Sequence, residues 1–266
     1  MATNGAGGRP VAIVTGAGGG LGGAIAHALA NSGFDLVLND LEVTEHLTAL
    51  CADLASVGAR ARPLAQDIAR EHELAAFVER AHDEFGRLDC LVNNAGVSVL
   101  SRGDMLDVTV ESFDRCIGVN LRAQFFLTQA FAKRLLRDRG AAAPTPLRPS
   151  IITITTVAVD DIVGTVLAEY GIAKAGLSHM IKHFAVRLAP LGIDCYEVRP
   201  GMLKTSMTES SRAKYDALIE SGFVPARRWG ELADVGHTVA SLAGGALRYA
   251  VGQVISADGG MRLKSF

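Results

Sequence analysis

Short runs of apolar and β-branched residues alternate along the chain with longer stretches in which apolar positions recur at helical spacing. The short runs predict strands at Val11-Ala12-Ile13-Val14, Leu36-Val37-Leu38, Leu91-Val92, Ile151-Ile152-Thr153-Ile154, Tyr196-Glu197-Val198 and Gln253-Val254-Ile255. The helical spacing predicts helices over 20–32, 43–57, 71–85, 109–138, 168–190 and 231–243. Such alternation favours parallel strands joined by crossover helices, and uninterrupted apolar strands indicate a sheet covered on both faces. The pattern predicts an α/β fold, a single-domain, Rossmann-like, doubly wound parallel sheet flanked by helices on both faces.

No internal repeat and no linker divides the 266 residues, a length that one large α/β domain accommodates. We expect residues 9–266 to form one nucleotide-binding domain, preceded by a small, polar and flexible leader over 1–8. The alanine- and proline-rich stretch within 138–150 cannot continue a helix, because proline lacks the required donor. We expect an exposed loop there, and the sequence leaves its role open.

Hydrophobic residues make up 49% of the chain and charged residues 20%, with a formal net charge of -2 at pH 7. This balance supports a folded core and gives no electrostatic reason to expect nucleic acid or an anionic membrane as a partner. No stretch approaches the ~18 uninterrupted apolar residues of a membrane span. The cysteines are dispersed, without metal-ligand spacing or the density of a disulfide scaffold: Cys51, Cys90, Cys116 and Cys195. We expect a cytoplasmic protein with reduced thiols, no metal site and a small-molecule ligand.

A glycine-rich segment, Thr15-Gly16-Ala17-Gly18-Gly19-Gly20-Leu21-Gly22, follows the first predicted strand and opens the first predicted helix. Residues without side chains let the backbone turn tightly and approach a pyrophosphate, while a helix N-terminus offers unpaired N–H groups and a favourable dipole. Glycines alone would be a weak signal, but their place in a βαβ unit strengthens it. We expect cofactor contacts from Gly16, Gly18, Gly19, Gly20, Leu21 and Gly22.

The second predicted strand ends in Asp40, 18 residues after Gly22. A carboxylate at this spacing accepts hydrogen bonds from the adenosine ribose hydroxyls and repels a 2′-phosphate. The next residue, Leu41, offers no arginine to hold that phosphate. We therefore expect Asp40 and Leu41 to contact the cofactor and NAD to be preferred over NADP. The alternative is that Asp40 is an ordinary turn or helix-capping residue.

Tyr170 and Lys174 lie four residues apart in a predicted helix, so they share one face and can point into one site. A phenol with a pKa near ~10 is a poor base at neutral pH, but a neighbouring ammonium and a nicotinamide cation both favour the phenolate. Tyr170 can then exchange a proton with a substrate oxygen while hydride moves to or from the cofactor. Taken alone, the pair would favour an ordinary exposed helix face over a catalytic role.

In combination, these segments resemble the short-chain dehydrogenase/reductase family: Thr15-Gly16-x-x-x-Gly20-x-Gly22, Asn93-Asn94-Ala95-Gly96, Asn120, Tyr170-x-x-x-Lys174 and Pro200-Gly201. The resemblance implies catalytic roles for Asn120, Tyr170 and Lys174, with Asn120 holding a water on the Lys174 side of a proton relay and Lys174 also holding ribose hydroxyls. Besides Tyr170 and Lys174, it implies cofactor contacts at Asp67, Ile68, Asn94, Ala95, Gly96, Pro200, Gly201, Leu203 and Thr205. Family members of this size form tetramers through the long helices around 109–138 and 168–190, so we expect a homotetramer.

One position departs from the family pattern. Most members place a serine 13 positions before the tyrosine to bond the substrate oxygen, and here that position is Val157. A loop longer by one residue would put Thr156 in the serine's place, with the same donor and acceptor but a methyl group that narrows the site. Thr155 is the weaker candidate, because alternation along a strand turns it to the opposite face.

The chain is therefore expected to be an NAD-dependent oxidoreductase that interconverts a small secondary alcohol and a ketone. Two other functions stay open. The segments around Tyr170 and Pro200 resemble bacterial 3-oxoacyl-acyl-carrier-protein reductases, although Leu191 stands where those enzymes often carry an arginine. A nucleotide-sensing protein without turnover is the alternative from another functional class. The sequence does not identify the substrate, the physiological direction or the stereochemistry.

Overall fold

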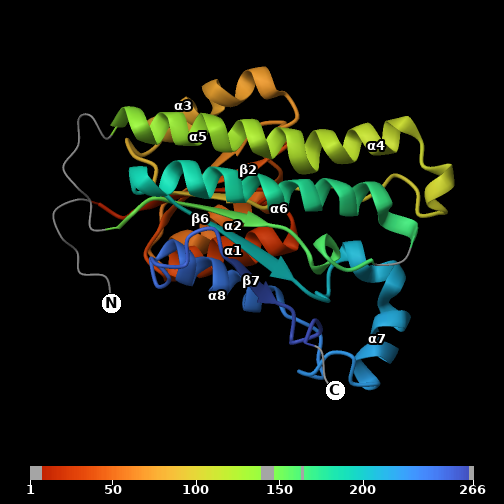
Figure 1. The fold of residues 1–266 in the computed structure, drawn as a ribbon. Helices are drawn as coiled ribbons and strands as arrows, with labels where there is room; N and C mark the ends of the chain where they lie inside the picture. Colours follow the sequence, from red (N-terminus) through yellow and green to blue (C-terminus); the bar gives the residue numbers. More distant parts are fainter. Residues whose placement is uncertain (1–7, 139–146, 163–164, 264–266) are drawn as a thin grey trace.

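A seven-stranded parallel sheet, with strand order β3-β2-β1-β4-β5-β6-β7, forms the centre of the protein (Figure 1). The computed structural model describes residues 8–138, 147–162 and 165–263. The strands are β1 (Val11–Thr15), β2 (Asp35–Asp40), β3 (Ala61–Ala65), β4 (Cys90–Asn93), β5 (Ser150–Ile154), β6 (Asp194–Pro200) and β7 (Val254–Ala257). The order reverses between β1 and β4, the point at which open α/β sheets bind ligands beyond the carboxyl ends of their strands. The predicted fold class is confirmed.

Helices cover both faces of the sheet (Figure 1). One face carries α1 (Gly20–Asn31), α2 (Glu45–Ser56) and α8 (Leu232–Ala243), and the other carries α3 (Leu74–Asp83), α5 (Gln124–Asp138) and α6 (Ala168–Leu188), with α4 (Val110–Ile117) extending from α5. Alternate strand residues point to opposite faces. Val14 and Val92 therefore join the core under α1 and α8, whereas Ile13 and Leu91 join the core under α3, α5 and α6.

Three elements differ from the sequence prediction. Strand β3 was not predicted, because its sequence ARPLA is only partly buried and contains Pro63. Proline is tolerated there because β3 is the edge strand. Helix α7 (Arg212–Glu220) was also not predicted. The predicted helix 109–138 is interrupted by a π-helical turn at Gly118–Ala123, so that α4 and α5 are separate elements.

Two sequence predictions fall mainly on residues that the structure does not describe. Residues 1–7 of the predicted leader and residues 139–146 of the predicted loop lie outside the described ranges. Within those ranges, no helix is both long enough and apolar enough to span a membrane.

Helices α1 and α8 approach each other closely at Gly236. A Cβ there would lie 2.8 Å from the carbonyl oxygen of Ala24. We predict that Gly236→Ala lowers the free energy of unfolding by about 1–3 kcal/mol, because α8 must move away from α1. Gly23→Ala in α1 is the matched control, since its Cβ would meet nothing closer than 3.8 Å. Urea unfolding measures both, and an unchanged midpoint for Gly236→Ala would contradict the prediction.

Candidate active site

The turn from β1 into α1 has no room for a side chain at three of its glycines. Gly16 has φ +64, and a Cβ on it would lie 2.9 Å from the Cα of Ala95. A Cβ on Gly22 would lie 2.2 Å from the carbonyl oxygen of Gly16, and one on Gly18 would lie 2.7 Å from Oδ2 of Asp40. Gly16 therefore suits a left-handed backbone conformation, and the other two suit close approaches between segments.

The N-terminus of α1 is built to accept an anion. The helix begins after Gly19, which makes no side-chain capping bond, and its first turn, which includes Gly20 and Leu21, contains no acidic residue. A helix N-terminus without a cap presents N–H groups and the positive end of the helix dipole. These residues fit the pyrophosphate of a dinucleotide, as the glycine spacing predicts.

Asp40, at the end of β2, is hydrogen-bonded to this turn. Its Oδ2 accepts a 2.9 Å hydrogen bond from the N–H of Gly18, and its Oδ1 accepts a 2.8 Å bond from the N–H of Leu41. Each carboxylate oxygen has a further lone pair that can accept a ribose hydroxyl. The side chain of Leu41 is exposed and contributes no charge.

The loop after β4 is bonded directly to the end of β1. The hydroxyl of Thr15 accepts 3.0 Å hydrogen bonds from the N–H groups of both Asn94 and Ala95. The amide of Asn94 donates to the carbonyl of Thr15 at 2.8 Å and to that of Gly16 at 3.2 Å. Asn94 and Ala95 therefore lie beside the glycine-rich turn.

Asp67 and Ile68 follow β3 and have different surroundings. Asp67 is partly exposed and accepts a 2.9 Å bond from the N–H of Ala69. The side chain of Ile68 is buried in the core that includes α3 residues such as Leu74. Only the backbone of Ile68 is therefore available to a ligand.

The Lys174 ammonium lies at the centre of the candidate catalytic site. It donates a 2.9 Å hydrogen bond to the carbonyl of Ile154 at the end of β5, and it lies 5.9 Å from the ring centroid of Tyr170. Gly96 closes the same space, because a Cβ on it would lie 2.9 Å from Oδ1 of Asn120 and 3.6 Å from Nζ of Lys174. Residues from β4, β5, α6 and the π-helical turn thus converge, as the resemblance implies.

Asn120 is fully buried in the π-helical turn Gly118–Ala123, an irregularity that is frequent at functional sites. Its Oδ1 accepts a 2.8 Å bond from the N–H of Val97, and its Nδ2 donates a 2.9 Å bond to the Val97 carbonyl. The amide therefore fixes the segment that follows Gly96. The water-holding role implied by the resemblance stays a prediction.

Burial shifts the pKa values of both candidate catalytic groups. It lowers the pKa of Lys174 to about 8, against an opposing effect of the Glu197 carboxylate. It raises the pKa of Tyr170 to about 12, and the nearby Cys116 adds to this shift. At neutral pH the ammonium is therefore mostly charged and the phenol carries its proton. This differs from the phenolate that the sequence analysis favours, because the effect of burial on Tyr170 dominates.

The first turn of the catalytic helix is itself anchored. Glu169, which precedes Tyr170, is buried and accepts a 2.6 Å hydrogen bond from the hydroxyl of Ser112 in α4. This bond fixes the start of α6 against α4, and with it the position of the Tyr170 backbone.

The two candidate threonines after β5 lie in different environments. The buried hydroxyl of Thr155 donates a 2.6 Å hydrogen bond to Oε1 of Glu197. Thr156 is only partly buried, and its hydroxyl accepts a long 3.3 Å bond from the N–H of Ala158. Val157, at the family's serine position, is 7% exposed and has no polar group. Thr156 is thus the freer hydroxyl of the pair.

The segment after β6 packs against the C-terminal end of the sheet. A Cβ on Gly201, which follows Pro200, would lie 2.6 Å from the Cα of Asp258. Leu203 is buried and forms an isolated parallel bridge with Gly230. Thr205 is partly exposed, and its N–H donates a 3.0 Å bond to the hydroxyl of Thr208. The structure thus leaves Thr205 more accessible than Leu203.

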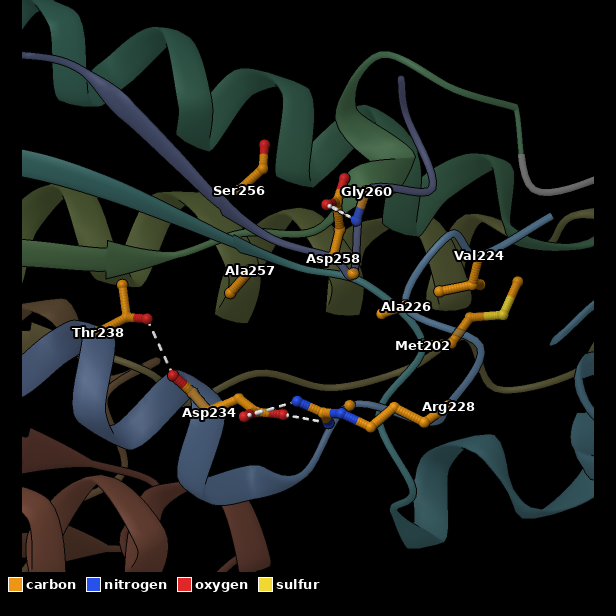
Figure 2. Close-up of a pocket in the computed structure, with 12 residues that line it drawn as sticks. Met202, Val224, Ala226, Arg228, Asp234, Thr238, Ser256, Ala257, Asp258 and Gly260 are labelled. Carbon is orange, nitrogen blue, oxygen red and sulfur yellow. Dashed lines mark hydrogen bonds and ion pairs between the residues drawn. The ribbon is translucent and has the colours of Figure 1, made fainter. Parts of the chain in front are cut away.

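A pocket of about 290 Å³ lies next to this segment (Figure 2). Its lining combines Met202 after β6, the segment from Val224 into α8 with Asp234, and the end of β7 with the following turn at Asp258. Arg228 and Asp234 form an ion pair at 2.7 Å across part of it. The sequence analysis did not identify this pocket, because its residues come from three separate segments.

The sequence analysis also missed a buried charged pair, Glu197 and Arg199 in β6. A signal was present, because Glu197 lies in the predicted strand and Arg199, one residue beyond its end, shares the same face if the strand continues. Charged side chains are rarely buried unless they are paired, so this spacing predicts a specific set of partners.

Comparisons with known proteins identify the family of this chain. Residues 16–262 match a family model described as Enoyl-(Acyl carrier protein) reductase. A 3-oxoacyl-[acyl-carrier-protein] reductase of Synechocystis sp. is 33% identical over 253 residues, which cover 94% of this chain and 96% of that relative. The chain belongs to the short-chain dehydrogenase/reductase family and is an oxidoreductase of that family.

Solved structures give the same result. The crystal structure of a 3-oxoacyl-[acyl-carrier protein] reductase from Brucella melitensis in complex with NAD is 43% identical, with a TM-score of 0.90, and the match covers 97% of this chain and 99% of that one. An Agrobacterium tumefaciens protein with bound NADP is 32% identical, with a TM-score of 0.82 and 96% of both chains covered. Relatives of this fold therefore bind either nicotinamide cofactor.

The different surroundings of Thr155 and Thr156 lead to a stability prediction. We expect Thr155→Val to lower the free energy of unfolding by about 1–3 kcal/mol, because Glu197 loses a donor in a buried site. Thr156→Val should change it by less than about 0.5 kcal/mol. Chemical unfolding of the two matched variants measures this difference. Equal losses in the two variants would mean that the hydrogen bond from Thr155 to Glu197 does not contribute to the free energy of unfolding.

Proposed function

We propose that this chain is an NAD-preferring dehydrogenase/reductase that interconverts a small secondary alcohol and a ketone. The observation that carries the proposal is the convergence of Tyr170, Lys174 and Asn120 beside Gly96, next to a turn that fits a dinucleotide. Tyr170 supplies a phenol that can donate a proton to an oxygen, and Lys174 supplies a positive charge beside it.

In ketone reduction, the protonated Tyr170 phenol donates its proton to the carbonyl oxygen. The nicotinamide cofactor, when bound, supplies the hydride. The charged Lys174 ammonium, whose pKa is about 8, stabilises the negative charge that develops on the tyrosine oxygen. The Thr156 hydroxyl orients the substrate oxygen. Alcohol oxidation reverses the proton transfer.

The preference for NAD rests on Asp40. Its carboxylate faces the glycine-rich turn through Gly18, where an adenosine ribose would lie, and a 2′-phosphate there would meet a negative charge. The neighbouring Leu41 supplies no compensating cation. The match to the Brucella melitensis structure with NAD, at 43% identity, supports the same preference.

The names of several relatives favour a second candidate, reduction of a 3-oxoacyl group carried on an acyl carrier protein. That activity requires a cationic surface for an acidic carrier. On α5, Arg134 and Arg137 are both paired with Glu79, so they present little free positive charge. Leu191 also supplies none. We therefore place the carrier-linked substrate second.

We also propose that the protein assembles as a cytoplasmic homotetramer. Exposed apolar side chains lie along α4, α5 and α6, the helices for which the family resemblance implies assembly: Val110, Phe113, Phe125, Ile172 and Val186. Such side chains on neighbouring helices are typical of a surface that another subunit covers.

Turnover of a substrate panel tests the proposed reaction. We expect NADH formation with at least one small secondary alcohol, and a loss of turnover of roughly 100-fold or more in Tyr170→Phe, because the proton donor is removed. Thr156→Val should also reduce turnover while leaving NAD binding unchanged. If wild type and Tyr170→Phe were equally silent while NAD still bound, the protein would be a nucleotide sensor. Activity confined to acyl-carrier substrates would favour the second candidate.

Cofactor choice is tested separately by binding. We expect a clearly lower dissociation constant for NADH than for NADPH, and a smaller difference in Asp40→Ser, because the repulsion of the 2′-phosphate is removed. Titration of the protein's effect on NADH fluorescence gives both constants. Equal affinities of the wild-type protein for the two cofactors would remove Asp40 from its assigned role.

A further inference from the structure

A buried carboxylate, Glu197 in β6, lies under the candidate catalytic site and has three donors. Thr155 donates to its Oε1 at 2.6 Å, the Arg199 Nε donates to the same oxygen at 2.5 Å, and Ser178 donates to its Oε2 at 2.7 Å. Glu197 is fully buried. The carboxylate therefore bonds the end of β5, the middle of α6 and its own strand together.

Arg199 extends these contacts to the loop after Thr156. Its guanidinium is 5% exposed, donates a 2.9 Å hydrogen bond to Ser178, and forms an ion pair with Asp160. Arg262, from the C-terminal segment, donates to the same Asp160 carboxylate at 2.6 Å and to Asp161 at 2.9 Å. A continuous set of charged contacts thus runs from Glu197 to the surface.

These contacts adjoin both the proposed substrate-binding residue, Thr156, and the lysine, Lys174. Thr155 immediately precedes Thr156, the proposed partner of the substrate oxygen. Ser178 lies one helical turn after Lys174, on the same face of α6. Strand β6 and helix α6 lie side by side (Figure 1), so one pair of residues can hold the loop and the helix in a fixed relation.

Stability alone is a poor explanation for such a pair. Burying two charges is costly, and well-packed apolar side chains of similar volume often serve a fold as well or better. What a fully bonded charged network supplies is a fixed geometry, because each donor and acceptor has one partner arrangement that satisfies it. The network is therefore suited to positioning.

We propose that Glu197 and Arg199 are positioning residues for the reaction, which hold the segment 155–161, and with it the Thr156 hydroxyl, in register with Lys174. This inference rests on the proposed function of Tyr170 and Lys174. It adds that the position of the Thr156 segment depends on a buried charged pair that does not touch the substrate.

Asp160 and Asp161 provide a matched pair of variants for the test. Both are about half exposed and both bind Arg262, but only Asp160 also binds Arg199. We expect Asp160→Asn to lower kcat/KM for the ketone roughly tenfold or more, because a misplaced orienting group is costly in rate. The dissociation constant for NADH should stay within about twofold, and Asp161→Asn should resemble wild type in both measurements.

Glu197→Gln adds a readout that a purely structural role would not move. The groups facing Lys174 are Tyr170 on its own helix, the neutral Asn120 from the π-helical turn and Glu197 from β6. The negative charge of Glu197 raises the pKa of Lys174, so its removal lowers that pKa below about 8. The fall in the rate of ketone reduction with rising pH should then begin at a lower pH in Glu197→Gln than in wild type.

Hydrogen exchange of the peptide that covers 155–162 separates failure of this proposal from failure of the proposed function. Faster exchange in Asp160→Asn but not in Asp161→Asn supports the positioning contacts even if no substrate turns over, an outcome that would count against the proposed function instead. Equal exchange and equal kcat/KM in the two variants would overturn the proposal. An unshifted pH profile in a folded Glu197→Gln would do the same.

Discussion

The hydrogen bonds between the end of β1 and the loop after β4 are the contacts on which the rest of the site depends. Strand order reverses here, so the chain leaves β1 toward one edge of the sheet and leaves β4 toward the other. The Thr15 hydroxyl and the Asn94 amide bridge the two halves at this point. Because the Gly16 backbone then passes against Ala95, the glycine-rich turn lies directly beside the Gly96 side of the candidate catalytic site.

Two of the candidate catalytic groups are each bonded to the backbone of a different segment. Lys174 bonds the Ile154 carbonyl at the end of β5, and Asn120 bonds both backbone groups of Val97. The Lys174 ammonium bonds a neutral carbonyl, and no carboxylate of the described residues lies within ion-pair distance of it. That arrangement lets burial lower the Lys174 pKa to about 8 while the residue stays charged at neutral pH.

The sequence predicted the parts of the structure that local rules control. Apolar runs located β1, β2 and β4 to β7, and the helical spacing located α1 and α6 within about two residues. Strand β3 lacked the apolar signal because an edge strand has one exposed side, and Pro63 argued against it. The π-helical turn at Asn120 was missed, because its six residues are too few to show a spacing of their own within the longer helical pattern. The buried partners of Glu197 needed the tertiary structure, since they come from β5 and α6.

The departure from the family pattern at Thr156 and the charged pair in β6 are connected by geometry. With Thr156 in the serine's place, as we propose, the tyrosine follows after 14 positions, one more than the 13 that the family resemblance implies. A longer loop costs little to close, but it holds its first residues less precisely unless something fixes it. Asp160 lies in this segment, and Arg199 and Arg262 bind it from β6 and from the C-terminal segment. The charged contacts therefore restore, from outside the loop, the positional precision that a shorter connection would supply by itself.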